Sequence, residues 1–219
     1  MKKKKKKHPI RVLLTAGPTR AYLDRVRFIS NYSTGELGFR LSQALIKKGF
    51  EVYAVIGPTQ QPFSDLPLKR LIEVETTDEM AKETLKLCRS VKPDFAIFSA
   101  AVLDFKPSKQ LAGKVSSSKK RWSLELISTP KILDQVTDRY PSIKRIGFKL
   151  EWKPMTGQTL SRFAQKLLDQ KKLDAVCINF LPQIRKKSHP LWIFTKEGRV
   201  SKCKTKAQTA KALADFVNG

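Results

Sequence analysis

The stretch FISNYSTGELG, from Phe28 to Gly38, gathers side chains that can hold a phosphate. A Ser, an Asn, a Ser and a Thr are followed by two glycines three residues apart. Groups of this kind bind anions where a loop turns into a helix, because the first backbone N–H groups of a helix have no partner within it. The stretch therefore fits three interpretations: a dinucleotide site, a catalytic loop, or the capped start of a helix.

Helix capping is the simplest of these interpretations. Ser33 and Glu36 have the S-x-x-E spacing of a capping box. A capped helix start can still bind an anion. Gly35 would let a ligand approach the backbone, and Gly38 would let the helix pack closely against a strand. We therefore expect Ser33, Thr34 and Gly35 to hold a substrate phosphate at the helix N-terminus.

The loop that leads to this stretch is long and basic. It begins at Gly17, after the apolar run IRVLLTA, and carries Arg20, Arg25 and Arg27. Loops between a strand and a helix usually have about 2–6 residues, so the extra length indicates a function. Asn31 is either a turn residue or a functional one. Its carboxamide donates and accepts hydrogen bonds without losing a proton, which suits the holding of a polar intermediate.

A second candidate loop, SAAVLDFKPSKQLAGKVSSSKKRW, begins at the end of another apolar run. Small residues at its start leave room for a flat ligand. Asp104 is its only acid, and it is surrounded by the lysines at positions 106, 109, 114, 119 and 120. An acid among lysines at a strand end suits a metal ion or a ribose, although each lysine by itself also fits a solvated surface.

The elements that must position these loops alternate between strands and helices. Apolar runs typical of strands occupy residues 10–16, 50–57, 71–76, 94–100, 121–127, 144–150, 174–180 and 191–195. Helices are predicted over 33–49, 78–92, 131–140, 159–172 and 205–217. Thr76 with Glu79 predicts a capping box for the second helix, and Thr129 predicts an N-cap for the third. This alternation predicts an α/β, Rossmann-like, doubly wound fold: a mainly parallel sheet with helices on both faces.

Ligands of such sheets bind beyond the carboxyl ends of the strands, so both loops lie at the expected ligand edge. A dinucleotide site would need G-x-G-x-x-G directly after the first strand, but Gly17 is followed by Pro18 and the other glycines come much later. The second strand ends at Gly57, without the acid that grips a ribose. The sequence therefore disfavours a nicotinamide-dependent oxidoreductase.

The composition of the chain limits which binding partners and which cellular location are expected. The 219 residues carry a formal net charge of +25, and six of these charges belong to the leading lysines. Such a chain attracts polyanions, either nucleic acid or small ligands with several phosphates. We expect a basic, disordered tail over residues 1–9 and a single α/β domain over 10–219. Because the sequence has neither a signal peptide nor a run of roughly 18–20 apolar residues, we expect a cytoplasmic protein without a membrane partner.

Three islands of the sequence together resemble a known family. They are TAGPTR with LDRVRFISNYSTGELG, then FSAAVLDFKPSKQLAGK with ELISTPKIL behind it, and IGFKLE leading to KKLDAVCIN. In order and spacing, over residues 10–180, they are similar to phosphopantothenate–cysteine ligase of the bacterial type. In many bacteria that domain is fused behind a flavin-dependent decarboxylase, whereas this chain resembles a stand-alone version, with residues 10–219 as the ligase domain.

The resemblance implies a two-step ligation in coenzyme A biosynthesis. The carboxylate of 4′-phosphopantothenate attacks the α-phosphate of CTP, which gives an acyl-cytidylate and pyrophosphate. The amine of L-cysteine then attacks the acyl carbon, releases CMP and gives 4′-phosphopantothenoyl-cysteine. Such steps need positioning and charge stabilisation more than a protein nucleophile. The family uses Mg²⁺ with CTP as co-substrate and forms homodimers, and the phosphopantothenoylcysteine decarboxylase would here be a separate partner.

The resemblance also assigns roles to residues. Asn31, Arg27 and Lys114 match catalytic positions, with Asn31 handling the acyl-cytidylate and Lys114 supporting its formation. Asp104 matches the aspartate of the nucleotide site and is the candidate metal ligand. The other nucleotide-binding positions are Gly17, Ala100, Ala101, Pro130, Lys131, Ile132, Leu133, Phe148 and Lys171. The chain departs from the family pattern at Pro18, Glu36, Val115 to Ser117, Leu167 and Phe180, which concerns the pose of the phosphates.

Other functions fit part of the sequence. A nicotinamide-dependent oxidoreductase would share the fold. A basic nucleic-acid-binding module would explain the charge, but it needs aromatic residues interleaved with basic ones on an exposed surface. Most aromatic residues here fall inside strand runs, so nucleic acid is the weaker partner. The nucleotide itself stays open, because bacterial relatives favour CTP and eukaryotic ones ATP, and no residue reads the base unambiguously.

Overall fold

The computed structural model describes residues 8–185 and 188–219, so most of the expected tail over residues 1–9 lies outside the described residues. The central strands are β1 (Arg11–Ala16), β4 (Glu51–Ile56), β5 (Arg70–Glu73), β6 (Phe95–Phe98), β9 (Lys144–Glu151), β10 (Ala175–Phe180), β11 (Leu191–Thr195) and β12 (Val200–Cys203). They form one eight-stranded sheet in the order β12-β11-β10-β9-β6-β1-β4-β5. Neighbours from β10 to β5 are parallel, whereas β11 is antiparallel to both β10 and β12. The mainly parallel sheet is therefore confirmed.

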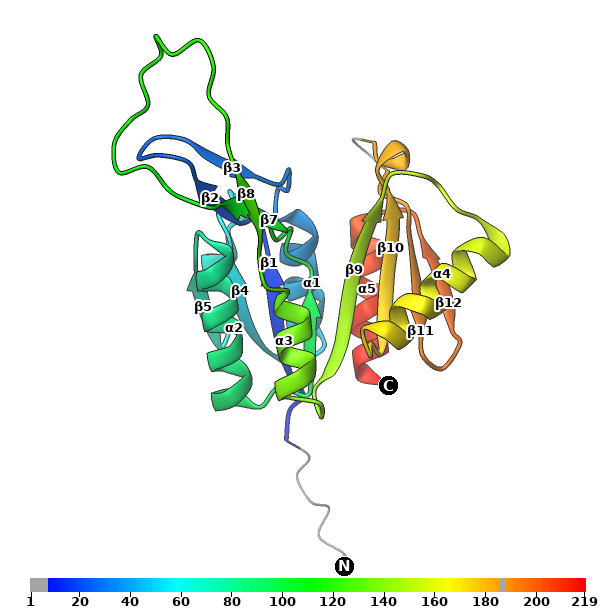
Figure 1. Ribbon diagram of the computed structural model, residues 1–219. Helices are drawn as coiled ribbons and strands as arrows, with labels where there is room; N and C mark the ends of the chain where they lie inside the picture. The colour runs from blue at the N-terminus through cyan, green and yellow to red at the C-terminus, as the bar shows by residue number, and fades with distance from the viewer. Residues whose placement is uncertain (1–7, 186–187) are drawn as a thin grey trace, which may run out of the picture.

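Helices cover both faces of this sheet (Figure 1). They are α1 (Glu36–Lys47), α2 (Thr77–Val91), α3 (Ile132–Arg139), α4 (Gly157–Gln170) and α5 (Lys206–Asn218). On one face α1 packs against α5, and on the other α2 packs against α3 while α4 covers β10 and β11. The doubly wound, Rossmann-like arrangement is as predicted. Within the described ranges no helix is long and apolar enough to cross a membrane.

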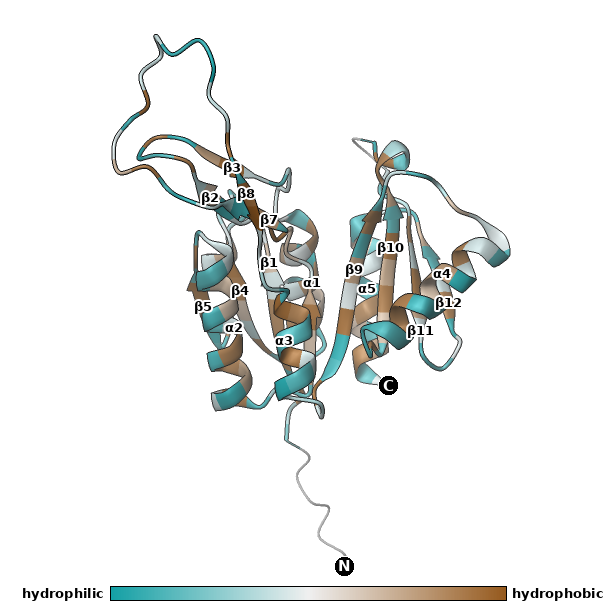
Figure 2. Ribbon diagram, viewed as in Figure 1, coloured by the Kyte–Doolittle hydropathy of each residue, from teal (hydrophilic) through white to brown (hydrophobic). Residues whose placement is uncertain are grey.

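Alternating side chains along the strands build a core on each face. In β1, Val12 and Leu14 join the apolar cluster under α1 and α5, whereas Leu13 joins the cluster under α2 and α3. Strands buried on both faces consist of nearly continuous apolar residues, which is why the sequence located them. Figure 2 shows these strands largely apolar and the outward surfaces of the helices polar. Gly38 brings α1 close to β1, since a Cβ there would lie 2.4 Å from the Cβ of Ala16.

Two small hairpins stand above the carboxyl edge of the sheet (Figure 1). One pairs β2 (Arg20–Tyr22) with β3 (Phe28–Ser30), and the other pairs β7 (Phe105–Pro107) with β8 (Leu126–Ser128). The strand predicted over 121–127 is therefore wrong for most of its length. It could not enter the main sheet at β6, because both edges of β6 are already paired with β1 and β9. Residues 108–125, called the arm below, project between β7 and β8 as a long loop.

Helix starts were predicted with mixed success. The capping box of Thr76 and Glu79 is confirmed at α2. The box of Ser33 and Glu36 is wrong, because Gly35 is the N-cap of α1 and no side chain caps it. The Glu36 carboxylate instead pairs with Arg40 at 2.8 Å and Lys206 at 2.6 Å.

The N-cap predicted at Thr129 is also wrong. The third helix begins later, at Ile132, with Lys131 as its N-cap. Thr129 is buried, and its hydroxyl donates to the Leu103 carbonyl oxygen at 2.5 Å. A tertiary hydrogen bond thus uses the hydroxyl that would have capped the helix.

Candidate functional site

The loops after β1 and β6 meet at the carboxyl edge of the sheet. Gly17 follows β1 with a left-handed φ of 72°, and a Cβ there would lie 2.8 Å from the Gly57 carbonyl oxygen. A side chain at this position would be strained and crowded. The Ala101 N–H donates to the Gly17 carbonyl oxygen at 2.9 Å, and the Thr19 N–H donates to the Ala101 carbonyl oxygen at 3.4 Å. These bonds bring Gly17 beside Ala101, and the role of both residues in nucleotide binding stays a prediction.

The place where the loops after β1 and β6 meet, at Gly17 and Ala101, is called the junction below. The Asn31 side chain contacts the loop after β6 at this junction. It directly follows β3, and its Nδ2 donates to the carbonyl oxygens of Val102 at 2.9 Å and Ala101 at 3.4 Å. The residue is exposed. Within the described part of the chain its carboxamide oxygen accepts no hydrogen bond. An amide that is fixed through its nitrogen holds its oxygen ready for a ligand. Asn31 is thus brought beside Ala101, and it is more than a local turn residue.

A buried carboxylate joins the loop of Arg27 to the arm. Asp24 is 0% exposed. Its Oδ1 accepts from the N–H groups of Val26 at 2.9 Å and Arg27 at 2.8 Å. Its Oδ2 accepts from the Val115 N–H at 3.1 Å and from Nη1 of Arg27 at 3.2 Å. Nη2 of Arg27 donates to the Val115 carbonyl oxygen at 3.2 Å. Lys114 directly precedes Val115, so this network places Arg27 and the backbone of Lys114 next to each other. Both residues are predicted catalytic positions.

The charge of Asp24 is fixed by its surroundings. Burial alone would raise the pKa of its carboxyl, but N–H donors from Val26, Val115 and Arg27, with the Arg27 charge, outweigh burial and hold the pKa below its usual range. The carboxylate therefore stays ionised and orients Arg27, whose guanidinium also lies over the Trp122 ring at 5.4 Å. Sequence reasoning missed Asp24. Its spacing to Val26 and Arg27 is typical of an aspartate that accepts from the backbone of its own turn, and this signal could have found it.

Asp104 and Lys131 form an ion pair beside the start of α3. The Thr129 N–H donates to the Asp104 carbonyl oxygen at 2.9 Å, which ties the chain before α3 to the loop after β6. The side chains of Asp104 and Lys131 are 61% and 52% exposed, so a ligand can compete for either.

The described residues contain no group of three or more His, Cys, Asp or Glu that could hold a metal ion. Mg²⁺ usually keeps several waters and binds one or two carboxylates together with substrate phosphates. A single exposed carboxylate such as that of Asp104 fits this mode of binding. The residues present are therefore compatible with Mg²⁺ that arrives with a nucleotide.

The remaining predicted nucleotide residues are not gathered in one place. Ile132 packs into the cluster under α2 and α3, whereas Phe148 packs on the opposite face, against the cluster under α1 and α5. A nucleotide that touches both would have to lie across the strand ends. Lys171, after α4, is held by the Asp134 carboxylate at 2.8 and 3.0 Å. Of the others, Ala100 packs against the cluster under α2, Leu133 against that under α4, and Pro130 is exposed.

A groove of about 820 Å³ opens beside the start of α1. Ser33 and Thr34 line it, together with the ends of β4 and β5. Gly35 is buried with a φ of 71°, and a Cβ there would lie 2.6 Å from Oγ1 of Thr59. The need for glycine at this position is therefore explained by packing and backbone conformation. Whether a substrate phosphate binds to Ser33, Thr34 and Gly35 stays a prediction.

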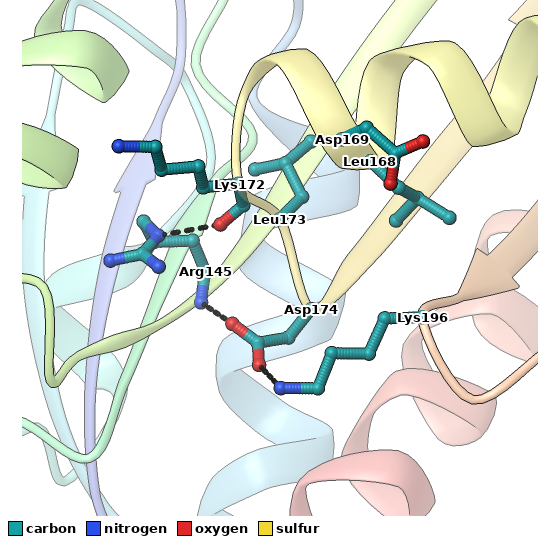
Figure 3. Close-up of a pocket in the computed structure, with 7 residues that line it drawn as sticks. All are labelled: Arg145, Leu168, Asp169, Lys172, Leu173, Asp174 and Lys196. Atoms are coloured by element: carbon teal, nitrogen blue, oxygen red, sulfur yellow. Dashed lines mark hydrogen bonds and ion pairs between the residues drawn. The ribbon is translucent and has the colours of Figure 1, made fainter.

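A smaller pocket of about 330 Å³ lies at the opposite, amino edge of the sheet (Figure 3). Arg145, 7% exposed, donates from Nε to the Lys172 carbonyl oxygen at 3.0 Å. Asp174, 5% exposed, accepts from the Arg145 N–H at 2.8 Å and from Nζ of Lys196 at 2.5 Å. The buried charged groups of this pocket are satisfied by the chain itself. We therefore assign it a structural role.

The sequence of this chain is similar to those of known proteins. The sequence profile of the DNA/pantothenate metabolism flavoprotein C-terminal domain matches residues 8–219. The coenzyme A biosynthesis bifunctional protein CoaBC of Borreliella burgdorferi is 32% identical over 189 residues, which are 85% of this chain and 46% of the relative. The chain thus spans about half the length of the curated relatives it matches.

Two solved structures superpose on this chain over most of its length. The DNA/pantothenate metabolism flavoprotein from Streptococcus pneumoniae superposes with a TM-score of 0.81 at 27% identity, covering 95% of this chain and 98% of that one. A Cab2 mutant in complex with phosphopantothenate-cysteine superposes with a TM-score of 0.67 at 19% identity, covering 95% and 85%. At that identity the second likeness concerns the fold alone.

Proposed function

We propose that this chain, which belongs to the family of the DNA/pantothenate metabolism flavoprotein C-terminal domain, joins 4′-phosphopantothenate to L-cysteine in coenzyme A biosynthesis. The reaction would pass through an acyl-nucleotidyl intermediate and give 4′-phosphopantothenoyl-cysteine. The observation that carries the proposal is the junction at the carboxyl edge. There Asn31 is bonded to the backbone after β6, and Asp24 holds Arg27 next to the segment of Lys114.

In the first step, the carboxylate of 4′-phosphopantothenate attacks the α-phosphate of the nucleotide, and pyrophosphate leaves. Both reactants are anions, so their approach needs cations. Arg27, held by Asp24, and Lys114, exposed on the arm beside it, would supply them. The exposed pair of Asp104 and Lys131 would open to receive the nucleotide, with Asp104 also facing Mg²⁺. When bound, Mg²⁺ held by Asp104 would offset the negative charge of the phosphates.

In the second step, the cysteine amine attacks the acyl carbon and the nucleoside monophosphate leaves. Asn31 would hold the intermediate through its carboxamide oxygen, which accepts no hydrogen bond within the described part of the chain, without taking part in proton transfer. Fixing the acyl group near the amine lowers the barrier through positioning. No protein nucleophile is required, because this step depends on positioning rather than on covalent catalysis.

We further propose that the nucleotide is CTP. A preference of about tenfold in kcat/KM over ATP needs only about 1.4 kcal/mol of differential transition-state binding. Separation of Ile132 and Phe148 onto opposite faces argues against a closed pocket made by those two side chains. A base bound across the strand ends, along the Pro130 to Leu133 segment, is the arrangement that remains.

The chain is proposed to act as a homodimer. Large apolar side chains are exposed on the two hairpins and the arm, with Phe105 54% and Ile127 44% exposed. Apolar side chains gathered on exposed hairpins are typical of interaction surfaces. Sedimentation of the full chain would test this, since a dimer is expected and a monomer at micromolar concentration would contradict it. A separate decarboxylase partner and the cytoplasmic location stay predictions.

The proposed function is tested by pyrophosphate release from the full chain. We expect release with 4′-phosphopantothenate and CTP in the presence of Mg²⁺, and continued turnover once L-cysteine is added. Equal rates with ATP would contradict the CTP preference only. Failure to release pyrophosphate with any nucleotide, together with binding and turnover of a nicotinamide cofactor, would replace the ligase with an oxidoreductase.

A further inference from the structure

The groove beside α1 has a charge pattern opposite to that of the chain as a whole. The chain as a whole has 44 Lys and Arg against 19 Asp and Glu. Among the described residues that line the groove, the only cation is Arg20 and the carboxylates are those of Glu73, Glu75 and Glu79, so the groove inverts this ratio. The negative lining therefore disfavours anionic reactants here, including the substrate phosphate predicted for Ser33, Thr34 and Gly35. Of the three proposed reactants, only the amino acid carries a positive charge.

One end of the groove already holds two opposite charges side by side. Nη1 of Arg20 lies 3.3 Å from Oε1 of Glu75, and the Tyr22 hydroxyl donates to the same carboxylate. The Arg20 N–H donates to the Glu75 carbonyl oxygen at 2.7 Å, which fixes the spacing of the two residues through the backbone. Their side chains are 29% and 52% exposed, so a small ligand can reach both.

This end lies close to the reaction centre. Arg20 in β2 is paired with Ser30 in β3, and Asn31 is the next residue. Ser33 and Thr34, which follow Asn31 closely, line the same groove. A ligand held by Arg20 and Glu75 is therefore next to the loop that is proposed to hold the acyl group.

We propose that Arg20 and Glu75 form the α-amino-acid site of the ligase, with the ligand carboxylate on Arg20 and its ammonium on Glu75. A zwitterion can insert into an ion pair, because each protein charge exchanges one partner for another of the same sign. The inference rests on the proposed function and assigns the second substrate to a place within the same edge. Glu79 is already engaged in the cap of α2, and Glu73 adds to the negative potential.

The reaction at this site is balanced. The cysteine nitrogen forms its bond to the acyl carbon as the bond from that carbon to the phosphate oxygen of the nucleotide breaks. The nucleoside monophosphate leaves with the electron pair. The ammonium loses one proton before the attack and one after it, both to water. Arg20 and Glu75 bind and orient the amino acid and are not required to transfer a proton.

The site is tested with two variants and two fragments of cysteine. Cysteamine keeps the ammonium, and 3-mercaptopropionate keeps the carboxylate. We expect Arg20→Ala to raise KM for cysteine about tenfold to a hundredfold, the effect of losing a hydrogen bond to a charged group. Inhibition by 3-mercaptopropionate should weaken with it, while inhibition by cysteamine stays unchanged. Glu75→Gln should give the reverse pattern for the two fragments.

The first half-reaction separates this inference from the proposed function. Pyrophosphate release without cysteine should be of wild-type size in both variants, which also reports correct folding. Arg25→Ala, an exposed arginine of the same loop, is the matched control and should leave KM for cysteine unchanged. If the variants instead raise KM for 4′-phosphopantothenate, or lose the pyrophosphate burst, the groove belongs to the acid substrate and the inference is overturned. Absence of any burst from the wild type would refute the ligase itself.

Discussion

The carboxyl and amino edges of the sheet use charged residues in different ways. At the amino edge, Arg145 and Asp174 are buried, and the chain supplies their partners (Figure 3). At the carboxyl edge, Asp104, Lys131 and Lys114 are exposed. A buried charge without a partner is costly, so the first kind must be satisfied within the fold, while the second kind keeps capacity for a ligand.

A pocket alone is therefore not sufficient to assign a functional site. Both edges are hollowed, and both pockets are lined by charged residues. They differ in what the charges already bind. Asp24 combines features of both edges. It lies at the carboxyl edge, but its carboxylate is buried and accepts hydrogen bonds from the chain itself. It resembles the amino-edge groups in its bonding, but it would serve the proposed site by positioning Arg27.

Lys114→Gln, at the carboxyl edge, should give the largest effect on activity. If activity did not fall, the contrast between the two edges of the sheet would no longer hold. Loss of one donor that stabilises developing negative charge lowers rates by roughly 10²–10³-fold, so pyrophosphate release should fall at least about a hundredfold. The melting temperature should not change, because Lys114 is exposed. Lys119→Gln, on the same arm, is the matched control. Release at the wild-type rate in Lys114→Gln would remove this lysine from the mechanism and point to Lys119 or Lys120.

Asp174→Asn tests the amino edge and should affect stability alone. The carboxylate accepts from the Arg145 N–H and from Lys196, and hydrogen bonds to a charged group contribute roughly 1.5–3 kcal/mol each to stability. We expect the free energy of unfolding, measured with urea, to fall by about 2–3 kcal/mol. Rates per folded molecule should stay at the wild-type level. A selective loss of activity would mean that the amino-edge pocket is functional after all.

Asn31→Asp should separate the two half-reactions at the carboxyl edge. The change is nearly isosteric, but a negatively charged carboxylate replaces the amide, whose Nδ2 donates to the Val102 and Ala101 carbonyl oxygens and whose oxygen would hold the phosphate-bearing intermediate. Product formation should fall by at least about tenfold, with pyrophosphate still formed near one equivalent. The acyl-nucleotide should be recovered from the quenched enzyme. Wild-type turnover without a trapped intermediate would leave Asn31 a structural residue of the loop.

Glu79→Gln should give the smallest effect, confined to the cap of α2. N–H groups of Thr76 and then Glu75 donate to the Glu79 carboxylate and lower its pKa from the usual 4.5. A lowered pKa means that the carboxylate stabilises the fold above about pH 4.5, and that this contribution is lost as the pH falls through the folded-state pKa. Because Glu79 is exposed, we expect only about 0.5 kcal/mol.

Thermal unfolding of the wild type and Glu79→Gln between pH 3 and 7 measures this effect. The wild type should be the more stable at neutral pH, and the two curves should converge toward pH 3. Parallel curves over the whole range would mean that the carboxylate charge does not contribute to the cap.

Much of the fold was predictable because its signals are local. The apolar runs of β1, β4, β6 and β10 mark strands that are buried on both faces. The capping box at α2 depends on residues three apart, so it too could be predicted from the sequence. The strand expected over 121–127 failed because a strand needs a free edge to pair with, and no local pattern reports which edges are free.

The sequence by itself determined the alternation of strands and helices, and with it the edge at which ligands are expected to bind. It also supplied the candidate residues, through types and spacings that resemble one family. Only the tertiary structure decided which of them meet. Ser33 does not cap α1, because Gly35 is the N-cap. Thr129 does not cap α3, because its hydroxyl donates to the Leu103 carbonyl oxygen. Asp24 gained its role through Val115, ninety-one residues away in the chain. Such contacts depend on how distant segments pack, because a hydrogen bond requires proximity in space and the sequence encodes only proximity along the chain.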